Sequence, residues 1–91
     1  MSEPYTVRLA GPVVRTIERD LSESVAAAVI EFLTGTLPEN PRRVGHALRN
    51  ELTGLWSARR GSYRIIYEIN DDARTVNVVR VDHRRDAYRS Q

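Results

Sequence analysis

The second half of the chain has the pattern of three consecutive β-strands separated by two turns, and this pattern limits the possible folds more than any other feature. In residues 63–69, Tyr or Ile occupies every second position, which is the two-residue period of a strand. Gly61-Ser62 predicts a turn before this segment, and Asn70-Asp71-Asp72 predicts one after it. A strand before Gly61 and a valine-rich strand over residues 76–81 complete an antiparallel meander.

The first half has the pattern of one short strand followed by two helices. Residues 5–9 alternate apolar and polar side chains, and Gly11-Pro12 then favours a helix start. Val14, Ile17 and Leu21 form the apolar stripe of the first helix, and Ser22 is a plausible N-cap for the second. The stripe of that second helix comprises Ala26, Val29, Ile30 and Leu33. Residues 37–44, with two prolines, are expected to form a loop.

These elements predict an α+β fold in a single domain over residues 1–91. We expect an N-terminal strand, a helical hairpin and a three-strand meander giving a four-stranded sheet, with a short C-terminal tail or helix. A domain of 91 residues buries only about 60% of its unfolded surface, so a deep cofactor cavity is not expected. Function should therefore lie on a surface or in a shallow groove.

The residue types and motifs that the sequence lacks argue against several kinds of catalytic site and against a membrane protein. Cysteine is absent, and two distant histidines make a poor metal set, so we expect no metal and no cofactor. There is no glycine-rich phosphate loop, HExxH or GxSxG motif. No apolar run approaches the roughly 20 residues of a membrane span, and the N-terminus lacks the features of a signal peptide. We expect a soluble, cytoplasmic protein with no membrane partner.

The charges are divided unevenly along the chain. Residues 1–41 hold three arginines and six acidic residues, whereas residues 42–91 hold eleven arginines and six acidic residues. All fourteen basic residues are arginine. A genome that favours arginine codons would explain much of this bias, but it does not explain where the arginines lie. A basic half with interspersed aromatic residues is suited to phosphate recognition, because the guanidinium group matches phosphate geometry and stacks on bases.

Three arginines are expected to converge at one end of the meander. Arg59 and Arg64 lie in adjacent predicted strands near their turn, and Arg84 follows the third strand. Such a cluster is best interpreted as a phosphate clamp, although a solvated hairpin explains Arg59 and Arg60 equally well. Arginine can stabilise extra charge on phosphorus but is a poor proton carrier at neutral pH.

Proton transfer and base stacking require other side chains. His83 carries an imidazole, the side-chain type whose unperturbed pKa lies nearest neutral pH, and Tyr88 has an aromatic face and a hydroxyl. On spacing alone, both are as well explained by a surface position near a chain end. Arg42, Arg43 and His46 follow the predicted loop and either contact nucleic-acid backbone or are simply solvated.

Three local patterns, together with the element order, resemble the RelE toxins of the RelE/ParE superfamily, which are the toxin halves of type II toxin–antitoxin pairs. The first is Asn40-Pro41 followed by Gly45-His46-Ala47-Leu48. The second and most specific runs from Gly54 to Ile69, centred on Tyr-Arg-Ile-Ile-Tyr. The third is Val81 to Tyr88, with Asp82 where glycine is usual. The resemblance covers nearly the whole chain.

The resemblance implies a ribosome-dependent endoribonuclease that cleaves mRNA in the A site without a metal. The 2′-hydroxyl would attack the adjacent phosphate and leave a cyclic phosphate and a 5′-hydroxyl. Arg59 would contact the scissile phosphate, Arg64 would stabilise the transition state, Arg84 would assist at the leaving oxygen, and Tyr88 would orient the nucleotide. Further RNA or ribosome contacts are expected from Arg42, Arg43, Arg60 and Arg85.

The implied partners are a cognate antitoxin, the ribosome with mRNA, and operator DNA only through the antitoxin. One departure affects mechanism, because Ser57 stands where well-known members place a basic residue, and serine cannot accept a proton at neutral pH. Either His83 or a substrate-assisted route then replaces this base. If His83 serves, activity should fall as a group with a pKa of about 6–7 becomes protonated. Two alternatives remain: a gyrase-inhibiting toxin of the ParE type, and an inactive member that only binds antitoxin as a corepressor.

Overall fold

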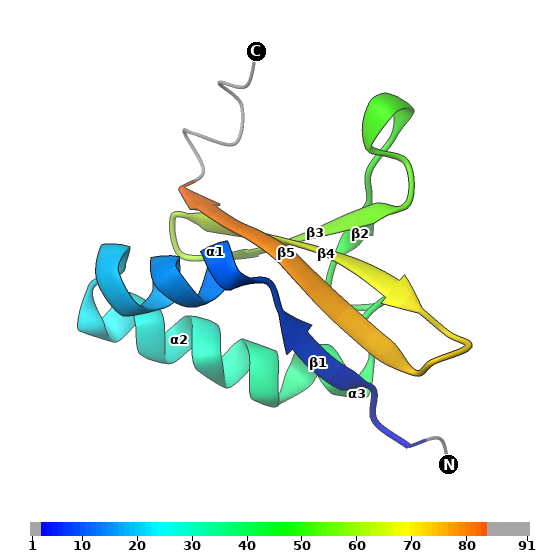
Figure 1. Ribbon diagram of the computed structural model, residues 1–91, viewed down its shortest axis with the longest axis horizontal. Helices are drawn as coiled ribbons and strands as arrows, with labels where there is room; N and C mark the ends of the chain where they lie inside the picture. The colour runs from blue at the N-terminus through cyan, green and yellow to red at the C-terminus, as the bar shows by residue number, and fades with distance from the viewer. Residues whose placement is uncertain (1–2, 84–91) are drawn as a thin grey trace.

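The computed structural model describes residues 3–83. In this part of the chain, helices pack on one face of a five-stranded sheet with the order β1-β5-β4-β3-β2 (Figure 1). The predicted α+β class is confirmed. The predicted number of four strands is wrong, because His46–Ala47 forms an additional short strand, β2, that pairs with β3. Two residues are too few to produce a recognisable periodicity.

The meander forms as predicted. Strands β3 (Leu55–Arg60), β4 (Tyr63–Asn70) and β5 (Thr75–His83) pair antiparallel. Gly61 has a φ of 60°, a left-handed conformation that glycine adopts without the steric cost of a Cβ, so it favours the tight turn between β3 and β4. Strand β1 (Thr6–Leu9) lies parallel to β5 and completes the other edge.

The helices lie close to their predicted positions, but their buried faces differ from the prediction. Val14 and Ile30 of the expected apolar stripes are exposed, whereas Val13 and Phe32 are buried. Helix α1 (Gly11–Arg15) continues as a π-helical segment, η1 (Thr16–Asp20). Helix α2 (Glu23–Thr34) begins at the predicted cap, where the Val25 amide donates to Ser22 Oγ at 3.3 Å. A single-turn 3₁₀ helix, η2 (Asn50–Leu52), precedes β3.

The segment predicted as a loop after α2 begins with a short helix, α3 (Thr36–Glu39). Pro38 lies in its first turn, where amide groups have no intrahelical partner and the missing N–H of proline costs nothing. The proline that predicted a break therefore lies within a helical turn.

The core lies between the helices and one face of the sheet. Its fully buried side chains include Val13, Val29, Leu37, Ile65, Tyr67, Val76 and Val78. The Tyr67 hydroxyl donates to the Pro41 carbonyl oxygen at 2.6 Å, and burial raises the pKa of Tyr67 to about 12 although Arg60 acts in the opposite sense. This bond ties the segment before β2 to the centre of the sheet.

No helix within residues 3–83 is long and apolar enough to cross a membrane.

Candidate functional site

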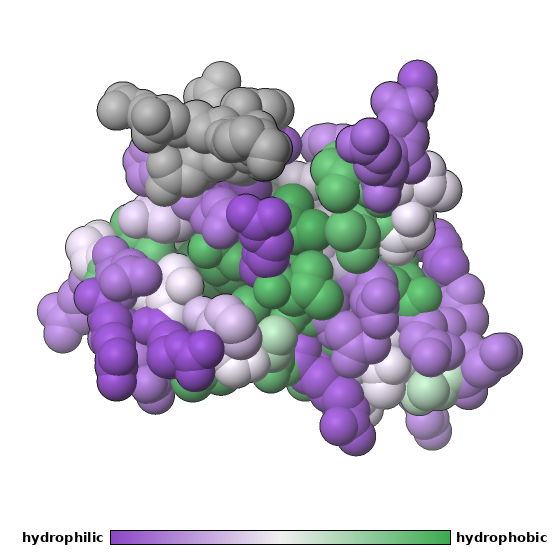
Figure 2. All heavy atoms as spheres, turned by 45° about the horizontal axis from the view of Figure 1, so that its top comes forward, coloured by the Kyte–Doolittle hydropathy of each residue, from purple (hydrophilic) through white to green (hydrophobic). Residues whose placement is uncertain are grey.

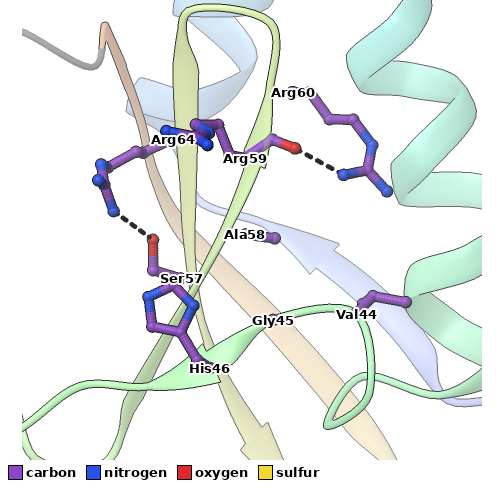
Figure 3. Close-up of a pocket in the computed structure, with 8 residues that line it drawn as sticks. All are labelled: Val44, Gly45, His46, Ser57, Ala58, Arg59, Arg60 and Arg64. Atoms are coloured by element: carbon purple, nitrogen blue, oxygen red, sulfur yellow. Dashed lines mark hydrogen bonds between the residues drawn. The ribbon is translucent and has the colours of Figure 1, made fainter.

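A groove of about 430 Å³ runs along the outer edge of β3 (Figure 3). Strand β2 pairs only with Trp56 and Ser57, so the edge of β3 beyond Ser57 borders the groove. The lining residues are Val44, Gly45, His46, Ser57, Ala58, Arg59, Arg60 and Arg64. Three of these eight are arginines, so the groove is strongly cationic.

Arg59 and Arg64 are brought together as expected. They are direct cross-strand partners in β3 and β4, so their side chains leave the same face of the sheet, opposite the helices. Arg64 Nη1 donates to Ser57 Oγ at 3.3 Å, and Ser57 is only 1% exposed. Two arginine side chains thus leave the sheet from directly opposed positions, and one of them is held by a buried hydroxyl.

His46 is the groove residue whose importance the sequence did not reveal. It is the cross-strand partner of Ser57, and therefore lies on the same face of the sheet as Arg59 and Arg64. Figure 3 shows its imidazole beside Ser57. The sequence linked His46 only to backbone contacts, because its position depends on the β2–β3 pairing, which no local pattern predicts.

Gly45 holds β2 close to β3. A Cβ at this position would lie 2.7 Å from the Ser57 carbonyl oxygen and closer still to the Tyr67 hydroxyl. Because real Cβ atoms do not approach so closely, this close packing requires glycine. The Gly45 backbone therefore fixes the place from which His46 enters the groove.

His83 does not join the arginine pair. It is the cross-strand partner of Tyr63, on the face that carries the helices, and the two rings meet edge to face at 5.2 Å. It lines a different pocket, with Thr16 and Asp20 of η1. His83, the residue expected to act as the base, therefore lies on the opposite face of the sheet from Arg59 and Arg64.

A β-bulge explains where His83 lies. Strict alternation from the buried Val76 and Val78 would place residues 80 and 82 on the helix face and His83 on the opposite one. The pairing instead shifts by one residue, since Tyr67 pairs with Val78 while Ile66 pairs with Arg80. One extra residue in β5 reverses the side of everything that follows.

The other predicted contact residues have separate places. Arg60 turns toward α2, with its guanidinium carbon 4.0 Å from the centre of the Phe32 ring, although it borders the groove. Arg42 forms an ion pair with Asp71 at 2.7 Å, and its pKa is raised mainly by that bond. Arg43 borders another pocket, beside α3. The RNA contacts of these arginines stay a prediction.

Arg84, Arg85 and Tyr88 lie outside the described residues. Their expected roles at the leaving oxygen, in RNA contact and in base orientation also stay predictions.

The groove offers a defined set of chemical groups. Paired guanidinium groups bind a phosphate and stabilise added charge on it, while the imidazole of a histidine can take up and release a proton near neutral pH. Within residues 3–83, no group of three or more His, Asp or Glu side chains is placed to hold a metal ion.

Comparisons with known proteins agree with this arrangement. Residues 13–88 match the family described as "ParE toxin of type II toxin-antitoxin system, parDE". Two Mycobacterium tuberculosis proteins are similar over 86 residues, or 94% of this chain: toxin RelG, at 50% identity over 98% of its length, and toxin RelE, at 44% over 88%.

Solved structures give the same result. The toxin–antitoxin complex RelBE2 from M. tuberculosis contains a chain with a TM-score of 0.84 and 49% identity, matched over 90% of this chain and 100% of that one. The isolated Escherichia coli RelE toxin shares the fold alone, with a TM-score of 0.71 at 21% identity, covering 87% of this chain and 83% of that one. The family match and these identities establish that the chain belongs to the RelE/ParE family of type II toxin–antitoxin systems as a RelE-type toxin.

Proposed function

We propose that this toxin is a ribosome-dependent endoribonuclease that cleaves mRNA in the A site and so inhibits translation. The observation that carries the proposal is the pairing of Arg59 and Arg64 on the exposed face of the sheet, beside the buried Ser57 hydroxyl. Two like charges directly opposite each other on neighbouring strands destabilise a sheet, so this pair does not serve stability. A phosphate bound between them would remove that repulsion.

The proposed reaction is an internal transfer at the scissile phosphate. The 2′-hydroxyl attacks the adjacent phosphorus, the P–O5′ bond breaks, and the products carry a 2′,3′-cyclic phosphate and a 5′-hydroxyl. Arg59 contacts the phosphate in the ground state, and Arg64 stabilises the charge that develops on its oxygens. Removing one preorganised donor of this kind typically costs about 10²–10³-fold in rate.

A cognate antitoxin is the proposed protein partner, which holds the toxin inactive. The mycobacterial relative with the similar fold was solved as a toxin–antitoxin complex. Several large apolar side chains are exposed on this chain, among them Leu9, Val14 and Ile30, and Figure 2 shows apolar residues gathered at the surface between projecting polar ones. Apolar surface of this kind is suited to protein contact.

Mapping RNA ends in cells tests the proposal. The protein is induced alongside the Arg64→Ala variant, and the 5′ ends of cellular RNA are sequenced. Wild-type induction should produce new 5′-hydroxyl ends inside translated codons, and the variant should produce far fewer at equal protein level. Cuts distributed equally over translated and untranslated regions would contradict ribosome dependence.

A gyrase-directed toxin is the second candidate, because the matching family is named for the ParE toxin. Plasmid supercoiling measured in the same cultures separates the two. Relaxed plasmids with intact mRNA would replace the nuclease by the ParE-type activity, and neither effect would favour an inactive, antitoxin-binding corepressor.

A further inference from the structure

We infer that His46 is the residue that takes the proton from the attacking 2′-hydroxyl. The inference rests on the proposed nuclease activity and assigns a step that neither Arg59 nor Arg64 can perform.

The first support is the place of His46 in the sheet. Residues directly opposite each other in an antiparallel pair lie on the same face. His46 is opposite Ser57, and Arg59 follows Ser57 by two residues in β3, so the two side chains share a face. Arg64 joins them from β4 as the partner of Arg59. The imidazole therefore borders the same groove as the proposed phosphate site.

The second support is the chemistry of the groove lining. The charged groups there are Arg59 and Arg60 from β3 and Arg64 from β4. Guanidinium groups do not give up their proton at neutral pH, and a serine hydroxyl such as that of Ser57 does not accept one. Among the lining residues, an imidazole is the only group suited to general base catalysis.

The third support is the way the backbone of β2 is held. Gly45 packs against the Ser57 carbonyl and the Tyr67 hydroxyl, and the Leu48 amide donates to the Leu55 carbonyl at 2.9 Å. His46 thus has fixed backbone on both sides while its side chain is exposed to a ligand. Positioning on a rigid element is a general requirement of a catalytic base.

The cleavage step needs no reactant besides the RNA and water. The 2′-oxygen bonds to phosphorus as its proton passes to the imidazole, and the P–O5′ bonding pair stays on the 5′-oxygen. Water protonates this oxygen, and the imidazolium then returns its proton to the hydroxide that remains. Arg64 and Arg59 keep their charge throughout.

A pH profile of single-turnover cleavage tests the inference. Purified toxin is mixed in excess with ribosomes that carry a defined mRNA, and rates are measured from pH 5.5 to 8.5 for the wild type, His46→Ala and His83→Ala. In the wild type, the rate should fall as the pH decreases, and we call this part of the profile the acidic limb. We expect His46→Ala to lower the rate about 10²–10⁴-fold at pH 8 and to abolish the acidic limb. Added imidazole should partly restore its rate. The His83→Ala protein should keep the acidic limb.

The possible failures are distinguishable. If the wild type cleaves RNA and His46→Ala keeps the same rate and the same acidic limb, His46 is not the base, while the proposed nuclease function stands. Loss of the limb in His83→Ala but not in His46→Ala would assign the step to His83 instead. No cleavage by the wild-type protein would overturn the proposed function, and the inference with it. Thermal unfolding and ribosome pelleting of each variant show that fold and binding are intact.

Discussion

Arg64 is distinguished from the other arginines of the groove by the group that orients it. Its Nη1 donates to Ser57 Oγ at 3.3 Å, and Ser57 is buried between β2 and β4. A guanidinium that is already fixed loses less conformational entropy on binding a phosphate than one that moves freely in solvent. Ser57, which lacks the basicity expected at this position, thus has a positioning role.

Ser57→Ala should slow cleavage while leaving the fold intact. It removes one hydrogen bond to a charged group, so the transition state should lose about 1.5–3 kcal/mol, or roughly 10–150-fold in rate. Single-turnover rates on programmed ribosomes measure this, and the pH limb should stay where it is in the wild type. A rate equal to that of the wild type would show that Arg64 does not depend on this hydroxyl.

The shortest strand, β2, shapes the site. Strand β2 has two residues, yet it carries His46 to the groove and closes one end of the β3 edge. Its position depends on Gly45 and on the bond from the Tyr67 hydroxyl to the Pro41 carbonyl oxygen.

Gly45→Ala should destabilise the protein and displace β2. The new Cβ would overlap the Tyr67 hydroxyl and the Ser57 carbonyl, and overpacking of this kind costs about 1–3 kcal/mol. Urea denaturation and cleavage rate should both report the change. The matched control is Gly11→Ala, where the nearest atom to the new Cβ is Arg15 Nη1 at 3.6 Å. Equal stability of the two variants would contradict the close packing at Gly45.

Local patterns were sufficient for most elements but not for the pairings between distant ones. The alternation over residues 63–69 and the cap at Ser22 are local signals, and β4 and α2 follow them. The β2–β3 pairing and the bulge opposite Ile66 and Tyr67 arise from contacts between separate segments. For this reason the arginine pair was predictable, whereas the position of His46 in the groove and of His83 outside it was not.

A polar network joins three segments that are distant in sequence. The Tyr5 hydroxyl donates to Asp71 Oδ1 at 2.6 Å, and Arg42 makes two bonds to the same carboxylate at 2.7 and 3.1 Å. The residues lie before β1, after α3 and in the turn between β4 and β5. The network connects both edges of the fold on the side away from the hairpin of Arg59 and Arg64.

This network predicts a stability change in acid. The bonds from Arg42 and Tyr5 lower the pKa of Asp71 from 3.8 to about 2. A depressed folded-state pKa means that the contribution is fully present above about pH 4 and is lost as the pH falls toward 2. The free energy of unfolding, measured by urea denaturation, should therefore fall less between pH 4 and pH 2 for Asp71→Asn than for the wild type. Tyr5→Phe should lie between them. If the unfolding free energy changed equally with pH in all three proteins, Asp71 would not contribute to the acid dependence of stability.

A reconstituted reaction shows whether the paired arginines on the exposed face of the sheet cleave RNA on the ribosome, as proposed. Purified wild-type and Arg64→Ala proteins are each incubated with a defined mRNA, with and without ribosomes, and the product ends are identified. We predict wild-type cleavage only on ribosomes, with a cyclic phosphate and a 5′-hydroxyl, and a rate about 10²–10³-fold lower for Arg64→Ala. Equal rates for the two proteins, or cleavage that needs no ribosome, would overturn the proposed function.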